Sequence, residues 1–274
     1  MNNLDWAKQK DIIYKMKIKY FSIPEMDATG NIKTLFTTTQ DTAWNFEDKK
    51  SQENYLALGK QLGLPPENMV KTKQKHTAVV KIVTRQNGGD GVLRSLDENT
   101  PYDGLITNEK NLLLCTVEAD CVPVYFYDPV KEVIAMVHSG WKGTVQKISE
   151  VTIQKMRDTF GCNPQNLKVA IGPHICKNCY EVGQDVFDEF AQSFDKTEME
   201  KIFSRKNEEK YLLNLQEAVK LTVIKNGVQE KNFLPTDICT YHSTIEGHRL
   251  CSYRRTKSPT QRMLTAIMMY ITHP

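Results

Sequence analysis

Residues 117–143 read VEADCVPVYFYDPVKEVIAMVHSGWKG. The apolar runs on either side of Asp128-Pro129 are β-branched and aromatic, which predicts two strands joined by a turn. If the strands pair as a hairpin, the start of the first lies beside the end of the second. Cys121 and His138 would then meet at one edge of a sheet, although they are 17 residues apart in the chain.

The segments around this hairpin predict both strands and helices. Short or alternating apolar runs predict strands at 12–21, 33–39, 77–83, 111–118, 166–172, 248–256 and 263–271, the last of which could equally be a helix. Helical spacing predicts helices at 51–64, 143–161, 184–194 and 213–227. The charged segment 195–210 is expected to be exposed, with a short strand around Ile202-Phe203. Because strands and helices do not alternate strictly, we predict the α+β class rather than a doubly wound parallel sheet.

Length and composition indicate an ordinary soluble protein. The chain has 274 residues, and we expect residues 1–274 to form a single domain. A net charge of +3 is too small to argue for a nucleic-acid partner, and we interpret KTKQK (71–75) as a solvated surface. No run approaches the ~18 apolar residues of a membrane helix, and the N-terminus lacks the apolar core of a secretion signal. We therefore expect a cytoplasmic protein without a membrane partner, whose seven cysteines are mostly free thiols.

The histidines and cysteines suggest one metal site. His76 directly precedes a predicted strand, so it too is placed at a strand end, like Cys121 and His138. Two imidazoles and one thiolate suit Zn²⁺, with a fourth position left for water or substrate. The three residues form no close-spaced metal motif, so hydrogen-bonded structural roles are the alternative.

Two further motifs suggest an anion site. In HSGWKG (138–143), two glycines flank Trp141-Lys142 immediately before a predicted helix. The free N–H groups at Gly143 and the charge of Lys142 would suit a phosphate, although a plain strand-to-helix turn explains the pattern equally well. In SYRRT (252–256), either Arg254 or Arg255 could hold a phosphate or a carboxylate.

The stretch IGPHICKNCYEVG (171–183) contains a C-x-x-C pair, Cys176 and Cys179. A metal knuckle would need a second pair, and the other cysteines late in the chain do not form one. A redox dithiol lacks the expected sequence context. We therefore interpret this pair as structural or as part of a substrate loop.

EADCVPV, VHSGWKG, IGPHICKNCYEVG and the late SYRRT, taken in this order, resemble the successive signatures of the laccase-domain family. The family is also known as the multicopper polyphenol oxidases, the peptidoglycan editing factors and the cytosolic purine nucleoside phosphorylases of that fold. The resemblance runs from about residue 30 to the C-terminus. It implies a four-layer α/β/β/α fold with two central mixed β-sheets.

The resemblance also implies a site and a reaction. The family's metal ligands fall on His76 in KQKHT, Cys121 in EADCV and His138 in VHSGWKG, which are the residues that strand-end placement had selected. The implied cofactor is Zn²⁺, and the implied partners are purine nucleosides and inorganic phosphate. The implied activity is phosphorolysis of adenosine, inosine, guanosine or methylthioadenosine, with adenosine deamination as a second activity.

The chain departs from the family pattern at four places. Where members have Gln-Val-His-Gly, this chain has Gln74-Lys75-His76-Thr77, and where they have Thr-Arg-x-Gly-Gly it has TTTQD (37–41). It also has Asn54-Tyr55 in place of Asn-Arg and Thr260-Gln261-Arg262 in place of Thr-Gly-Arg. All three metal ligands are kept. The departures therefore bear on substrate preference more than on metal binding.

Several mechanisms are open at the level of sequence. Phosphorolysis needs phosphate held by Lys142, Gly143 and Arg254 or Arg255, whereas deamination would use water activated by the metal. Asp120 is either a proton carrier or a turn residue. Copper-dependent phenol oxidation is the alternative that one family name suggests, but the chain has six histidines and no His-x-His pair. The remaining readings are a metal-free hydrolase or deamidase, with Cys121 as nucleophile and His138 as base, and a binding protein without activity.

Overall fold

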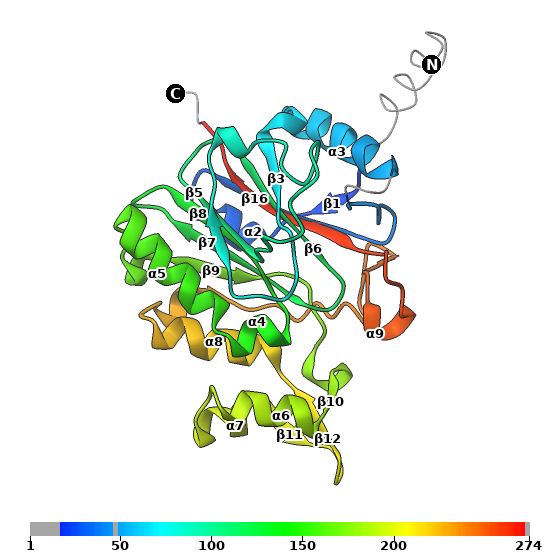
Figure 1. Cartoon of the computed structure of the whole chain (residues 1–274), viewed down its shortest axis with the longest axis vertical. Helices are drawn as coiled ribbons and strands as arrows, with labels where there is room; N and C mark the ends of the chain where they lie inside the picture. The colour runs from blue at the N-terminus through cyan, green and yellow to red at the C-terminus, as the bar shows by residue number, and fades with distance from the viewer. Residues whose placement is uncertain (1–16, 46–48, 272–274) are drawn as a thin grey trace.

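The computed structural model describes residues 17–45 and 49–271 and has two β-sheets at its centre (Figure 1). The first sheet has the strand order β1-β2-β16-β6-β3. Its strands are β1 (Tyr20–Phe21), β2 (Ile32–Thr37), β3 (Met69–Lys71), β6 (Leu113–Glu118) and β16 (Met263–Met269). Only β3 and β6 run parallel to each other, so the sheet is mixed.

The second sheet contains the hairpin predicted from residues 122–138. Its order is β13-β9-β7-β8-β5-β4, with parallel pairs at both ends. The strands are β4 (Val80–Ile82), β5 (Gly104–Thr107), β7 (Val122–Asp128), β8 (Val133–Ser139), β9 (Lys168–Ile171) and β13 (Phe233–Leu234). Pro123 of β7 pairs with His138 of β8, so Cys121 comes to lie at the same sheet edge as His138, as predicted.

Alternation along β7 explains how the two sheets pack. Val124 and Phe126 belong to a buried cluster with α5, whereas Tyr125 and Tyr127 belong to a second cluster shared with the first sheet. Successive side chains of a strand point to opposite faces, so one strand can line both cores. The outer face of the first sheet is covered by α3 in a third cluster. The layers are therefore helix, sheet, sheet and helix, which confirms the predicted four-layer α/β/β/α fold.

The helices cover the outer faces and the two ends of this double sheet (Figure 1). They are α2 (Pro24–Asp27), α3 (Lys49–Leu62), α4 (Trp141–Val145), α5 (Ile148–Phe160), α6 (Gln184–Ala191), α7 (Lys196–Ile202), α8 (Leu215–Lys225) and α9 (Tyr253–Thr256). A small sheet, β10 (Glu181–Gly183), β12 (Lys210–Leu213) and β11 (Phe203–Arg205), packs with α6 and α7. A two-stranded hairpin, β14 (Thr244–Ile245) and β15 (His248–Arg249), precedes α9. Within 17–45 and 49–271, no helix combines the length and apolar composition needed to cross a lipid bilayer.

Most predicted elements are present, with shorter bounds. β1 and β2, from the strands predicted at 12–21 and 33–39, pair with each other, although residues 12–16 of the first predicted strand lie outside the described residues. The helix predicted at 51–64 is α3, which ends just before Gly63, a residue with φ 65°. The run at 263–271 is a strand, β16, and not a helix.

Two local predictions were wrong. The helix predicted at 143–161 is broken into α4 and α5, because Lys147 adopts a left-handed conformation with φ 61°. The strand predicted at 248–256 is only β15, and SYRRT forms the single turn α9, begun by the Ser252 side chain accepting from the backbone N–H of Arg255. The charged segment at 195–210 is largely exposed, and the short strand expected around Ile202-Phe203 is present as β11. The segment also contains α7, which opens with a capping box between Asp195 and Glu198.

Candidate functional site

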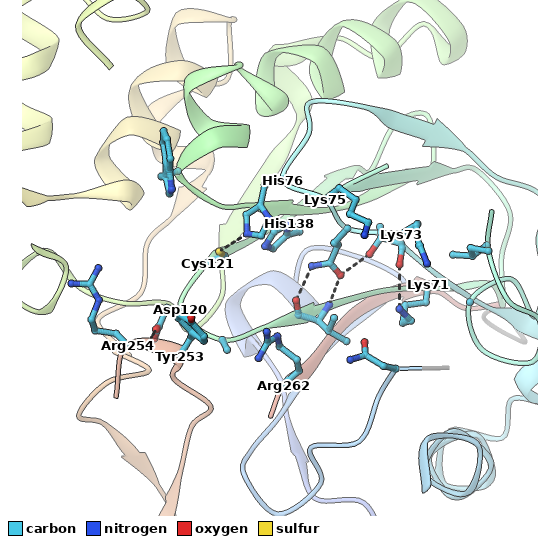
Figure 2. A pocket seen from close by; sticks show the side chains of 18 of the residues that line it. Lys71, Lys73, Lys75, His76, Asp120, Cys121, His138, Tyr253, Arg254 and Arg262 are labelled. Carbon is cyan, nitrogen blue, oxygen red and sulfur yellow. Dashed lines mark hydrogen bonds between the residues drawn. The ribbon is translucent and has the colours of Figure 1, made fainter. Parts of the chain in front are cut away.

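Three donors selected from the sequence converge in the structure. His76, Cys121 and His138 each place a ligand atom within 4.8 Å of the other two (Figure 2). The Cys121 sulfur lies 3.8 Å from His76 Nε2, and the two imidazole rings meet edge to face with centroids 4.9 Å apart. His138 is buried, Cys121 is half-buried and His76 is exposed, so the cluster opens toward solvent on the His76 side.

Two unusual backbone conformations present these side chains. His76 has φ 60°, and Asp120, directly before Cys121, has φ 92°. Residues other than glycine occupy this region rarely, and such strain collects at functional sites. The loop that carries His76 is fastened to β6 by Gln74, whose side-chain amide donates to the Val117 carbonyl and accepts from the Val117 N–H.

One buried carboxylate, that of Asp103, orients both histidines. It accepts hydrogen bonds from the backbone N–H groups of Lys75, His76 and Thr77, and from the Thr77 hydroxyl. Its Oδ1 also lies 2.8 Å from Nδ1 of His138, which leaves Nε2 of that ring directed toward the cluster. A carboxylate behind a ligating imidazole is the usual outer shell of a protein metal site.

The two histidines differ in electrostatics. Although the residue is exposed at the surface, partial desolvation of its ring lowers the pKa of His76 to about 4, and positive charge on His138 adds to this effect. His76 therefore offers a neutral imidazole. Burial alone would lower the pKa of His138, but the charges of Glu118 and Cys121 and the hydrogen bond to Asp103 raise it well above the ordinary value. A cation at the cluster would replace the proton that His138 otherwise holds.

Two neighbouring features fit a cation at this position. Glu118 is fully buried, and neither of its carboxylate oxygens has a hydrogen-bond partner within the described residues. Its Oε2 lies 3.7 Å from His138 Nε2. Burial raises the pKa of Glu118 to about 7, and the nearby Thr116 hydroxyl offsets only part of this increase. A bound cation would take over the positive charge that protonated His138 otherwise places beside this carboxyl group. At Gly140, a Cβ atom would lie 2.7 Å from His76 Cδ2 and 3.0 Å from the Cys121 sulfur, so a side chain there would crowd both ligands.

The cluster forms part of the wall of a pocket of about 580 Å³. The pocket's basic lining residues are Lys71, Lys73, Lys75, Arg254, Lys257 and Arg262. Figure 2 shows the three labelled lysines on one side of the cluster and Arg254 on the other. The aromatic side chains of Trp141, Tyr180 and Tyr253 also line the pocket. A pocket of this size holds a small organic ligand, and its charge favours an anionic one.

The structure separates the two candidate arginines. Arg254 lines the pocket, and its guanidinium lies 5.1 Å from the Tyr180 ring centroid and donates to the Glu181 carbonyl. Arg255 does not line the pocket, and its guanidinium donates to three backbone carbonyls, those of Thr240, Tyr241 and Leu250. Arg254 is therefore the arginine placed to meet a ligand.

The other predicted anion-binding residues lie outside the pocket. Lys142 and Gly143 are not among its lining residues, and the Lys142 ammonium lies 5.5 Å from the Trp141 ring centroid. Gly143 is buried, and a Cβ there would lie 3.2 Å from the Thr77 carbonyl oxygen. The helix that begins at Trp141, α4, has only five residues.

KTKQK is not simply a solvated surface, as we interpreted it from the sequence. Lys71, Lys73 and Lys75 all line the pocket, and Lys71 is buried. Lys73 and Lys75 both form ion pairs with Glu98. Every residue from 71 to 76 lines the pocket, so this segment forms one of its walls.

Asp120 also lines the pocket, but both of its oxygens are engaged. Oδ1 accepts from the Thr240 hydroxyl at 2.6 Å, and Oδ2 accepts from the Arg254 backbone N–H at 2.6 Å. These bonds tie the loop before Cys121 to two later segments of the chain. Of the two roles considered for Asp120, the geometry favours that of a turn residue that positions its neighbours.

Comparison with known proteins agrees with this fold. A sequence model of the family described as "Multi-copper polyphenol oxidoreductase laccase" matches residues 30–270. The chain is 32% identical over 203 residues to the purine nucleoside phosphorylase YlmD of Bacillus subtilis, covering 74% of this chain and 71% of that protein. It is also 32% identical over 231 residues to a purine nucleoside phosphorylase of Bacteroides thetaiotaomicron, covering 82% of each.

Two solved structures share the architecture. The hypothetical protein YfiH of Bacillus licheniformis superposes with a TM-score of 0.82 at 26% identity, over 93% of this chain and 97% of that one. YlmD from Geobacillus stearothermophilus superposes with a TM-score of 0.79 at 27% identity, over 88% and 93%. The family expected from four ordered motifs is thus the one that sequence and structure both match, and the chain belongs to the multi-copper polyphenol oxidoreductase laccase family.

Proposed function

We propose that this protein is a zinc-dependent purine nucleoside phosphorylase. It would cleave the bond between the purine and the ribose of adenosine, inosine, guanosine or methylthioadenosine with inorganic phosphate. The observation that carries the proposal is the convergence of His76, Cys121 and His138 on the wall of a basic, partly aromatic pocket. The names of the relatives from Bacillus subtilis and Bacteroides thetaiotaomicron support the same reaction.

The donor set supports zinc as the metal. Two imidazoles and one thiolate with an open fourth position are typical of catalytic zinc sites. Zinc held there would act as a Lewis acid that stabilises negative charge on an oxygen of the bound reactants. Asp103 would keep His76 and His138 in position, and the buried Glu118 would balance part of the ion's charge.

The basic side chains would bind and orient phosphate. Arg254 and Arg262 both line the pocket, and guanidinium groups match the geometry of phosphate oxygens. Lys75 would add positive charge on the same wall as His76. With phosphate held in this way, a phosphate oxygen attacks C1′ of the ribose, the bond from C1′ to the purine nitrogen breaks, and the purine leaves with that electron pair. The products are the free base and ribose 1-phosphate.

The aromatic side chains would hold the base. Trp141, Tyr180 and Tyr253 come from α4, from the loop before β10 and from α9, and they offer flat apolar surfaces along the pocket. Purine rings stack favourably on such surfaces. This arrangement would place the base against aromatic walls and the charged reactants near the basic ones.

The two other enzymatic readings have less support. In the described residues, the grouped metal donors are this three-residue cluster and one separate group of three cysteines and a histidine. Multicopper oxidation of phenols needs several linked coppers, so the donor sets argue against it, although one His₂Cys site would also bind copper. A metal-free hydrolase would use Cys121 and His138, and metal analysis of the purified protein distinguishes it from both metal-dependent readings.

The reaction is tested by incubating the purified, zinc-loaded protein with adenosine and phosphate. We expect free adenine and ribose 1-phosphate in equal amounts, detected by chromatography, and no adenine when phosphate is left out. Inosine, guanosine and methylthioadenosine in the same assay give the order of preference. Formation of inosine from adenosine without phosphate would replace phosphorolysis by deamination, and unchanged nucleosides under all conditions would remove the proposal.

Arg254→Gln should raise the KM for phosphate about 10- to 100-fold with little change in Tm, because a charge-assisted hydrogen bond contributes about 1.5–3 kcal/mol. The matched variant is Arg255→Gln. Its guanidinium holds three carbonyls, so we expect a lower Tm and an unchanged KM for phosphate. Steady-state kinetics with phosphate as the varied substrate, together with thermal denaturation, separates the two effects. Equal kinetic effects in both variants would contradict the assignment of Arg254.

A further inference from the structure

The C-x-x-C pair has the partner that sequence reasoning did not find. Cys176 and Cys179 lie together with Cys239 and His242, and each of the four offers a ligand atom within 4.8 Å of all the others. The second pair is a C-x-x-H, which a search limited to cysteines overlooks. We propose that these four side chains form a second, structural zinc site, separate from the cluster of His76, Cys121 and His138.

The chemistry of the four donors favours zinc. Three thiols and one imidazole in two pairs, each pair separated by two residues, are a typical donor set of closed tetrahedral zinc sites. Bonds of ~2.3 Å to sulfur place tetrahedral donors ~3.8 Å apart. The 3.4 Å between the Cys179 sulfur and His242 Nδ1 is already within that spacing. A pair of donors at the observed limit of 4.8 Å would need to approach by about 1 Å to reach it.

The surrounding backbone already holds the donors together. Cys176 directly precedes the 3-10 turn η4 (Lys177–Cys179), and Cys179 is its last residue. Cys239 and His242 lie between β13 and β14. An isolated β-bridge joins His174 to Cys239. In it, the His174 N–H donates to the Ile238 carbonyl, and the Thr240 N–H donates to the His174 carbonyl. The Cys176 backbone N–H donates to the Cys239 sulfur at 3.3 Å, which holds the two donor-bearing segments together.

The burial of the donors suits a structural ion with one accessible side. Cys239 is buried, Cys176 and Cys179 are half-buried, and His242 is exposed. A divalent cation held by these four side chains would therefore be reached by solvent on the His242 side.

A zinc ion here would fasten the wall of the pocket. Cys179 is followed by Tyr180, which lines the pocket, and Cys239 by Thr240, whose hydroxyl donates to Asp120 beside Cys121. The loop ending at Glu181 also accepts a hydrogen bond from Arg254. The ion would therefore join two segments that are 60 residues apart in the sequence and that both contact the site.

The test is metal and thiol analysis of the full chain, purified under reducing conditions in the presence of zinc. We expect two zinc ions per chain in the wild type and one in His242→Ala or Cys239→Ser. The matched control, Cys162→Ser, replaces a buried cysteine that belongs to neither cluster and should keep two. His242 is exposed, so His242→Ala keeps the experiment informative if Cys239→Ser fails to fold.

A second readout separates this site from the one in the proposed function. The Cys121→Ala variant should keep one metal ion per chain. When that ion is replaced by cobalt, the variant should show strong thiolate-to-metal charge-transfer absorption. This absorption should disappear in the double variant Cys121→Ala/Cys239→Ser. This readout does not depend on activity, so failure of the phosphorylase proposal leaves it unaffected. The inference is overturned if His242→Ala and Cys239→Ser keep the wild-type zinc content. It is equally overturned if mass spectrometry finds a disulfide between any two of the three cysteines.

Discussion

Replacing Cys121 by alanine should remove one of the two expected zinc ions per chain. The rate of phosphorolysis should fall by at least about 100-fold, because a Lewis acid supplies several kcal/mol of transition-state stabilisation. The Cys121 sulfur is the single thiolate donor of this cluster, and it lies 3.8 Å from His76 Nε2. His76→Ala should have the same effect, since two remaining protein donors bind zinc much more weakly than three. Zinc content by mass spectrometry and turnover of adenosine with phosphate measure the two losses.

The fold should survive both replacements. Cys121 is only half-buried and His76 is exposed, so neither side chain fills the core. The matched control is Cys162→Ala, which removes a buried cysteine packed against α5 and should keep both zinc and activity. Full zinc content in purified Cys121→Ala or His76→Ala would show that the three donors do not share an ion. Loss of activity with full zinc content would instead make Cys121 a nucleophile.

The strand pattern of residues 117–143 was sufficient to place Cys121 and His138 at the same edge of a sheet. A hairpin brings the residue before its first strand next to the end of its second, and β7 and β8 pair in that register over seven residues. His76 was found by the same reasoning, because it precedes a predicted strand. The sequence could not show that β4 and β8 lie in one sheet, because β5 lies between them and was not predicted as a strand. β5 has only four residues and begins with Gly104.

The groups around the ligands were harder to predict, because their roles arise from contacts between distant segments. Asp103 sits before the unpredicted β5, so nothing in its local pattern related it to His76 or His138. The lysines of KTKQK have the composition of a solvated surface, and only the packing of the loops around them makes them line a pocket. Cys239 and His242 form a C-x-x-H pair that a search limited to cysteines missed, and the two cysteines that complete their group lie 60 to 66 residues earlier.

Local chain geometry accounts for the remaining differences. Apolar spacing continues through Lys147, so the pattern at 143–161 is that of one helix, and one left-handed residue is enough to divide it. The aromatic and β-branched residues of HRLCSYRRT favour a strand, but the Ser252 cap starts a helical turn that directs Arg254 toward the pocket. Periodicity therefore predicted which residues are buried better than it predicted where each element begins and ends.

Asp103→Asn should weaken zinc binding at the three-residue cluster about 10- to 100-fold, the usual effect of losing an outer-shell carboxylate. Asparagine keeps the shape of the side chain but has one acceptor oxygen in place of two, and no negative charge. It cannot accept from the N–H groups of His76 and Thr77 and also from Nδ1 of His138. Both histidines would lose their fixed orientation, and activity should fall at limiting zinc and recover partly at high zinc.

Asp128→Asn is the matched control for this prediction. Like Asp103, Asp128 is a fully buried aspartate. It is the last residue of β7, and its Oδ1 accepts from the backbone N–H groups of Val130 and Lys131. Both variants should therefore lower Tm, because each disturbs hydrogen bonds to a buried carboxylate. Only Asp103→Asn should change the zinc affinity measured by competition with a chelator, since Asp128 lies at the end of β7 away from Cys121. If the two variants lose stability equally and bind zinc equally well, Asp103 supports the fold without positioning the metal ligands.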